Sequence, residues 1–341
     1  MKKRDSSLDL VRIAALFSVV SVHFFWNNGF YEEIVAGRNM YIMTVMRTLF
    51  LDCVPLFIVL TGFLMNKKTL TKKYYKGIIK TLETYLLACL LCEAYSCLFM
   101  DYPFSVKTVL SDVFKFTAAP YAWYIEMYIG LFLLIPFLNI LYHGLKSKKE
   151  KRILLLTLIL MVSLPGVVNI RIKILPFWWE NLYPVMYYFL GCYLNEYQVE
   201  IKRSVNIILL LAHLLIAGSL NYYLSYQTTY RRGVWDGWGC FLNLITTILV
   251  FCLVKGIRTD NWNDKVKKFL QHISGLCLGG YLCSWAADHI IYDWFNPKVP
   301  VMTDRLYYYI PVVLAVFVLS LVFAEILECC SILIHKGVRK K

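Results

Sequence analysis

Arg12 and His23, near the start of the chain, have the type and spacing of a functional pair within one apolar helix. Eleven residues make just over three helical turns, so both side chains share a face, about 16 Å apart along the axis. Ionisable groups inside a bilayer are costly and are therefore functional candidates. A neutral imidazole can act as a general base or accept an acyl group itself. The plain alternative is a histidine bonded to neighbouring helices or reaching towards water.

Other ionisable residues are expected at a similar depth. Counted from the predicted outer helix ends at 1.5 Å per residue, His23 lies about 6 Å and Glu126 about 7 Å below the outer surface. Arg47 and Asp288 fall in the same outer third of their segments. A histidine, an acid and an arginine could therefore meet at one level, although depth alone does not say which helices are neighbours. The alternative for Glu126 is a polar contact between helices.

A lysine-rich segment, NKKTLTKKYYKGIIK, holds six lysines in residues 66–80. Four of them recur at spacings that would share a helical face: Lys72, Lys73, Lys76 and Lys80. One interpretation is a topology signal that also attracts anionic lipid. The other is a docking site for a phosphate-rich cytosolic donor such as an acyl-CoA.

The composition places the chain in a membrane. Of its 341 residues 59% are hydrophobic and only 17% are charged, whereas soluble domains have roughly 45–50% and 25%. A soluble enzyme is therefore excluded. The formal charge of +14 is better explained by membrane topology than by nucleic acid, and we expect no nucleic-acid partner and no metal ion.

Ten segments are expected to span the membrane as helices, which predicts an all-α polytopic bundle. Seven are uncharged and long enough to cross, and three weaker ones contain charges. The seven are 13–31, 127–145, 153–170, 205–230, 237–254, 269–287 and 306–324, and the three are 41–65, 78–99 and 177–195. With both termini cytoplasmic, 25 of the 36 Lys and Arg residues fall in inner segments and 9 in outer ones. Residues 104–117 are predicted to form a short amphipathic helix on the outer surface.

Several stretches together resemble the acyltransferase-3 family of membrane acyltransferases. The opening RDSSLDLVRIAALFSVVSVHFFW resembles the family's helix with paired Arg and His, which fall on Arg12 and His23. VPLFIVLTGFLM (54–65) resembles the second-helix signature, with Thr61-Gly62 where Ser-Gly is common. AWYIEMYIGLFLLIP (122–136) resembles the tryptophan-containing helix, and LGGYLCSWAADHIIY (278–292) resembles a late segment in which Ser284 replaces a common histidine. The resemblance covers nearly the whole chain, as a single domain of residues 1–341.

The resemblance implies transfer of an acetyl or other short acyl group from cytosolic acyl-CoA to a cell-surface glycan hydroxyl or amine, or to a small molecule. It implies that His23 is the base or acyl relay, Glu126 its partner and Arg12 the donor-side anchor. From their charge and spacing we expect Lys72, Lys73, Lys76 and Lys80 to hold the donor. We expect the acceptor near Trp123, Arg47 and Asp288, and a passage that brings the thioester to His23.

The implied location is the plasma membrane, as a multi-pass protein among membrane lipid, with homo-oligomerisation left open. The membrane module of vancomycin-resistance-type serine racemases is similar, but no racemase domain follows here. The competing interpretation is a transporter of a small solute or amino acid, since transporters also bury ionisable groups at mid-membrane. Outer-loop aromatic residues such as Trp178 and Trp179 fit an interfacial belt, or stacking against a sugar.

Overall fold

The computed structural model describes residues 4–169 and 172–338, and its regular elements there are helices. The predicted loop charges at 2, 3, 171 and 339–341, and the last residue of segment 153–170, lie outside these ranges. The long helices are α1 (Ser6–Asn27), α2 (Gly37–Phe50), α3 (Cys53–Met65), α5 (Ile78–Phe99), α7 (Trp123–Gly144), α8 (Lys148–Leu158), α10 (Tyr183–Tyr197), α11 (Arg203–Ser225), α12 (Phe241–Lys255), α13 (Asp264–Phe295) and α14 (Tyr309–Val338). Short helices connect them: α4 (Lys72–Tyr75), α6 (Val106–Phe114), η1 (Ile159–Ser163), α9 (Pro165–Val168), η2 (Glu180–Leu182), η3 (Asn296–Lys298) and η4 (Met302–Tyr308).

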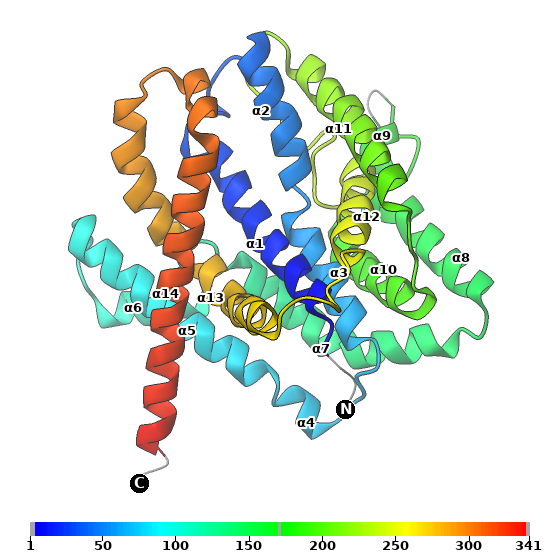
Figure 1. Cartoon of the computed structure of the whole chain (residues 1–341), viewed down its shortest axis with the longest axis horizontal. Helices are drawn as coiled ribbons and strands as arrows, with labels where there is room; N and C mark the ends of the chain where they lie inside the picture. Colours follow the sequence, from blue (N-terminus) through cyan, green and yellow to red (C-terminus); the bar gives the residue numbers. More distant parts are fainter. Residues whose placement is uncertain (1–3, 170–171, 339–341) are drawn as a thin grey trace.

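The predicted all-α bundle is confirmed, and each of the ten expected segments contains a helix. Seven helical stretches are long and apolar enough to cross a membrane. The number of crossings, about ten, and the cytoplasmic position of both ends stay predictions. The first helix begins and the last helix ends at the same end of the bundle (Figure 1), as an even number of crossings requires. The predicted outer amphipathic helix is α6, with the exposed Phe104 and Phe114 beside it and on it.

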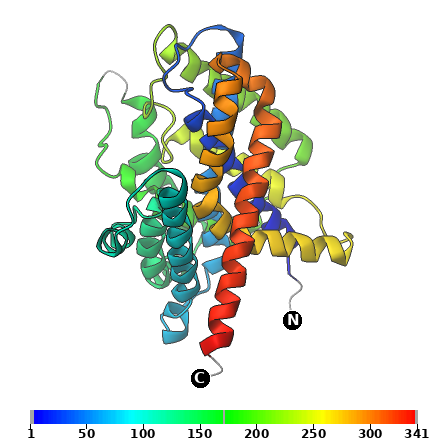
Figure 2. The same cartoon turned by 90° about the vertical axis from the view of Figure 1, so that its left-hand side faces the viewer.

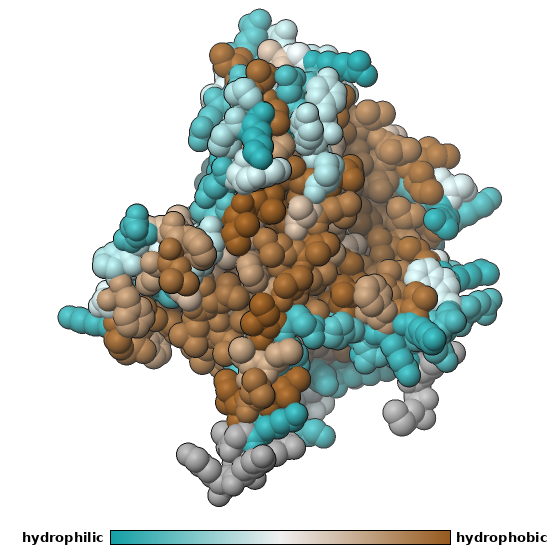
Figure 3. Space-filling view, turned by 60° about the vertical axis from the view of Figure 1, so that its left-hand side comes forward, coloured by the Kyte–Doolittle hydropathy of each residue, from teal (hydrophilic) through white to brown (hydrophobic). Residues whose placement is uncertain are grey.

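An apolar surface covers most of one face of the bundle, and hydrophilic residues gather above and below it (Figure 3). Exposed leucines and isoleucines of α7, α11 and α14 contribute to the apolar surface of the molecule. A soluble protein rarely exposes so large an apolar area. The bilayer supplies the solvent for these side chains, so the surface and the sequence agree on a membrane protein.

Helix α1 is the central element of the bundle. It packs against α2, α3, α12, α13 and α14, and Ala15, Leu16 and Phe24 on it are fully buried. Helix α13 has two parts: its first turns lie across the bundle and its second part runs along it (Figure 2). The change of direction falls inside one continuous helix, because α13 runs from Asp264 to Phe295 without a break.

Helices α3 and α10 cross at glycines. A Cβ atom on Gly62 would overlap the carbonyl oxygen of Tyr188, and one on Gly191 would overlap that of Val59. Small residues at such crossings let two backbones approach closely, which is the main source of helix association inside lipid. The Gly62 of the second-helix signature is therefore a packing residue.

We expect Gly62→Ala and Gly191→Ala each to destabilise the fold by roughly 1–3 kcal/mol, because the added methyl group must push two backbones apart. Thermal unfolding of the purified protein in detergent measures this. Gly130→Ala on α7 is the matched control, since nothing lies within 4 Å of a Cβ there. Equal melting temperatures for all three variants would contradict the close crossing.

Candidate functional site

His23 lies between two polar groups from other parts of the chain. Its Nδ1 atom is 3.2 Å from Oδ2 of Asp288 on α13. The hydroxyl of Tyr121, which precedes α7, donates a hydrogen bond of 2.8 Å to the same oxygen. The Tyr121 ring lies against the imidazole, with centroids 4.0 Å apart. The three residues form one cluster near the outer end of α1.

The burial of this cluster is uneven. Asp288 is fully buried, whereas the His23 side chain is 16% exposed. The Nδ1 atom does not meet Oδ2 with hydrogen-bond geometry, and the two form an ion pair only when the imidazole is protonated. The His23 Nε2 atom has no hydrogen-bond partner among residues 4–169 and 172–338. A carboxylate on one side of an imidazole with a free nitrogen on the other is the arrangement that lets histidine act as a base.

Helix α13 brings Asp288 to His23 through one continuous face. Tyr281, Ser284 and Asp288 are spaced three and four residues apart and are all buried. The Tyr281 hydroxyl donates to the carbonyl oxygen of Tyr121, which fixes the segment that carries that tyrosine. Ser284 donates to the carbonyl of Tyr281 within its own helix, so at the position of the family's common histidine this chain has a backbone-bound hydroxyl.

Glu126 is not brought to this cluster. It is exposed on the first turns of α7, and in the described part of the chain it has no hydrogen-bond or ion-pair partner. Asp288, which we expected at the substrate, is the acid beside His23. Depth placed both carboxylates at the same level, but only Asp288 is on a helix that packs directly against α1.

Arg12 reaches towards the inner part of α13. Its Nη1 donates a 2.6 Å hydrogen bond to Ser274, and Asp9 lies 3.7 Å from the same nitrogen. The side chain is 29% exposed. Arg12 therefore contacts α13 at Ser274, and it lies about three turns before His23 along α1.

The four lysines expected to hold the donor are all exposed, and they are divided between two helices and the residues that join them. Helix α4 holds Lys72 and Lys73 and ends before Lys76, and Gly77 separates it from α5, which holds Lys80. Lys80 is engaged by Glu328, 3.2 Å away. The segment is anchored by Tyr74, which stacks on Phe132 of α7 with ring centroids 4.4 Å apart.

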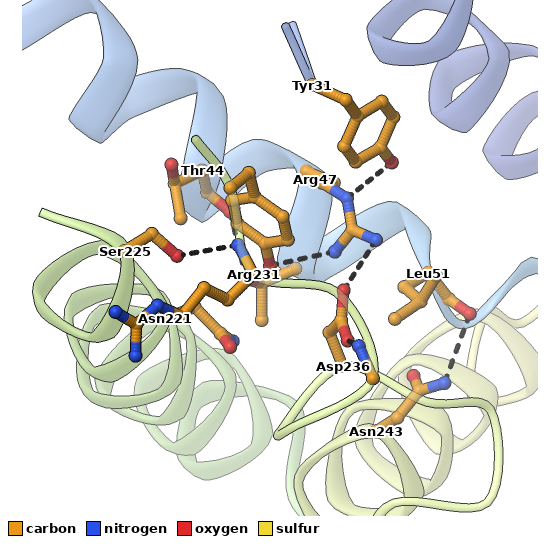
Figure 4. Close-up of polar contacts among 12 residues, drawn as sticks. Tyr31, Thr44, Arg47, Leu51, Asn221, Ser225, Arg231, Asp236 and Asn243 are labelled. Carbon is orange, nitrogen blue, oxygen red and sulfur yellow. Dashed lines mark hydrogen bonds and ion pairs between the residues drawn. The ribbon is translucent and has the colours of Figure 1, made fainter. Parts of the chain in front are cut away.

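Arg47 belongs to a separate buried cluster (Figure 4). It donates to the hydroxyls of Tyr31 at 2.7 Å and Tyr230 at 2.9 Å. Its third nitrogen pairs with Asp236 at 2.7 Å. Arg47 is 4% exposed and its donor groups are bound within the protein. The expected substrate contact is therefore an internal contact that holds the loop of residues 226–240 against α2.

Trp123 is also engaged within the protein. It stacks on Trp238 of the same outer loop, with centroids 4.3 Å apart and planes at 14°. Sequence reasoning missed Tyr121, Tyr31 and Asp236, which lie in connecting segments without periodicity. Tyr230 was expected only as one of the outer-loop aromatic residues, and not as a partner of Arg47. The unmatched charges of Arg47 and Asp236 could have indicated a pair, because a buried charge needs a partner.

A helical bundle with an apolar surface and buried ionisable clusters defines a polytopic membrane protein. Residues 5–325 match the model of a family described as an acyltransferase domain. The chain belongs to this acyltransferase-3 family, and it is a membrane acyltransferase. No curated protein matches the chain. No solved structure matches it either. The relation to serine racemases stays a prediction.

We expect Arg47→Met to destabilise the protein by about 3–5 kcal/mol, because it leaves Asp236 buried without a partner. Arg47→Met combined with Asp236→Leu should recover most of that loss. Thermal unfolding in detergent compares the three proteins. A single variant as stable as the unmodified protein would contradict the buried ion pair.

Proposed function

We propose that this membrane acyltransferase moves an acetyl or other short acyl group from acyl-CoA to a hydroxyl or amine of a cell-surface glycan across the plasma membrane. The observation that carries the proposal is His23, whose Nδ1 lies 3.2 Å from the buried Asp288 and whose Nε2 has no hydrogen-bond partner in the described part of the chain. Family membership supplies the acyl-transfer chemistry. A base near the outer end of the bundle fits an acceptor that approaches from that side.

In the proposed reaction His23 is the general base. Its Nε2 takes the proton of the acceptor hydroxyl or amine as that atom attacks the thioester carbonyl. The carbon–sulfur bond breaks, and the imidazolium returns the proton to the coenzyme A thiolate. Asp288 stabilises the imidazolium through Nδ1, and Tyr121 keeps the carboxylate oxygen in place. A relay through an acyl-imidazole would use the same Nε2 atom.

The donor would approach from the inner end. Lys72, Lys73 and Lys76 are exposed there and could attract its phosphates, with Arg12 deeper in the bundle. From Ser6 to His23 the helix extends about 25 Å, so the acyl arm must enter the bundle to reach the base. The large cavity of the described residues does not include His23 in its lining, and the passage stays a prediction.

The acceptor would approach from the outer end, where aromatic side chains are exposed. Trp26 lies one turn beyond His23 and is 56% exposed, and Trp178 is 88% exposed. The guanidinium of Arg232 covers the Trp26 ring at 4.4 Å. A flat aromatic face with a neighbouring cation offers stacking and hydrogen bonding together, which suits a polyhydroxyl acceptor.

Substitutions test whether Asp288 or Glu126 is the acid that acts with His23. We expect His23→Ala and Asp288→Asn each to lower the rate of acetyl transfer by roughly 10²–10⁴-fold, the usual contribution of a general base. Glu126→Gln should change it by less than about twofold, because that side chain is exposed and away from His23. Radiolabelled acetyl transfer to glycan in membrane vesicles measures the rates, with melting temperatures as the control for folding.

A loss caused by Glu126→Gln but not by Asp288→Asn would reverse the assignment of the acid. Full activity of His23→Ala would remove the histidine from the mechanism.

Replacing Lys72, Lys73 and Lys76 together by Gln should raise the KM for acetyl-CoA roughly tenfold and leave kcat unchanged, because exposed cations contribute to binding and not to the chemical step. Lys146→Gln with Lys149→Gln is the control, since it also removes exposed charges from the inner surface. An unchanged KM in the triple variant would leave these lysines with a topological role only.

One feature favours the transporter alternative. Helices α2 and α3 are interrupted at Asp52, which is fully buried and has no hydrogen-bond partner for either oxygen in the described part of the chain. Interrupted helices with buried carboxylates are common at transport sites. Solute uptake that depends on expression and consumes no acyl-CoA would support transport and contradict the proposed acyl transfer.

A further inference from the structure

A large cavity opens at the end of the bundle where the chain begins. Its volume is about 1280 Å³. It lies between the ends of α1, α3, α10 and α12 and is closed by the two connections at residues 198–202 and 256–263. The proposed acyl transfer makes no use of it.

This cavity is separate from the His23 cluster. Helix α1 lines it with Ser7 and Leu10, which point roughly 140–200° around the helix from Arg12. Arg12 contacts α13 instead, and α13 contributes no residue to the lining, which ends at Trp262. The cavity and the candidate active site therefore lie on opposite faces of α1.

The mouth of the cavity carries an excess of positive charge. Five basic and three acidic side chains line it: Arg4, Lys202, Arg203, Lys255 and Arg258, with Asp5, Glu200 and Asp260. Lys255 is paired with Asp5 at 2.9 Å, and Arg4 is paired with Asp9.

Three of these basic side chains are available for binding. Within residues 4–169 and 172–338, Lys202, Arg203 and Arg258 have no ion-pair partner, and all three are exposed. Arg203 also begins α11, whose N-terminus adds partial positive charge. The charge at the mouth is therefore available to an anion.

One part of the cavity wall is apolar. Phe63 lies in the last turn of α3, and Leu194 and Phe251 lie near the C-terminal ends of α10 and α12. All three are buried within the protein. A cationic mouth above an apolar wall matches an amphiphile with a phosphate head. Basic pockets between membrane helices on the cytoplasmic side are typical sites for anionic lipid headgroups.

We propose that this cavity binds the phosphate of an anionic phospholipid at the inner membrane surface, with Lys202, Arg203 and Arg258 contacting the headgroup. A soluble phosphate compound would present the same chemical group. The apolar part of the wall favours the lipid, because a free phosphate would make no contact with Leu10, Phe63 or Trp262.

The test measures lipid binding by the purified full-length protein in detergent. Native mass spectrometry with phosphatidylglycerol should show bound lipid, and phosphatidylcholine should bind much more weakly. Arg203→Gln with Arg258→Gln should weaken phosphatidylglycerol binding roughly tenfold or more, as expected for lost charge-assisted contacts. Lys146→Gln with Lys149→Gln removes the same charge from the same end outside the cavity and should bind like the unmodified protein.

Two competition experiments distinguish a lipid phosphate from a soluble one. Coenzyme A and inorganic phosphate should not displace phosphatidylglycerol at equal concentration. Displacement by coenzyme A alone would make the cavity a nucleotide site and overturn the lipid proposal. Equal lipid binding by the cavity variant and the control variant would overturn it as well.

A second measurement does not depend on the charged variants folding. Brominated phosphatidylglycerol should quench part of the tryptophan fluorescence of the unmodified protein, and Trp262→Phe should lose that part because Trp262 lines the cavity. Quenching that is identical in Trp262→Phe would contradict a lipid at this position. Neither readout uses acyl transfer, so failure here is distinct from failure of the proposed function.

Discussion

A buried carboxylate, Asp288, joins three parts of this bundle at the candidate site. An isolated ionised carboxylate in an apolar interior is strongly unfavourable, so it must be paired or hydrogen-bonded. Asp288 receives the hydroxyl of Tyr121 and lies beside the imidazole of His23. The same interaction joins α1, α13 and the segment before α7, so the chemistry and the packing depend on one group.

The helical architecture was accessible from the sequence because a bilayer imposes strong rules. Backbone groups in lipid must be satisfied within a helix, so apolar length predicts a helix directly. The weak segment 41–65 contains Arg47 and Asp52, and the structure interrupts it between Phe50 and Cys53. Hydropathy predicted a crossing there, but not the interruption, which depends on contacts with other helices such as that of Asn243 with the Leu51 carbonyl.

The candidate site could be predicted only in part from the sequence. Spacing on one helix identified Arg12 and His23, because their relation is local. The acid beside His23 could not be chosen from spacing along one helix. Glu126 and Asp288 are expected at the same depth, and only the packing of the helices shows that Asp288 is the one beside His23. Arg47 lies at the expected depth too, yet the outer loop folds inward and binds it through Tyr230 and Asp236. The lysine spacing assumed one helix, whereas the chain forms two, with Gly77 between them.

The course of α13 has a consequence for the candidate site. Its first turns lie across the bundle, and its second part carries Asp288 (Figure 2). From Ser274 to Asp288 the helix runs uninterrupted for about 21 Å. Ser274 is held by Arg12 and Asp288 lies beside His23, so this one helix contacts both functional candidates of α1. The spacing of the two contacts along α13 therefore has to match the spacing of Arg12 and His23 along α1.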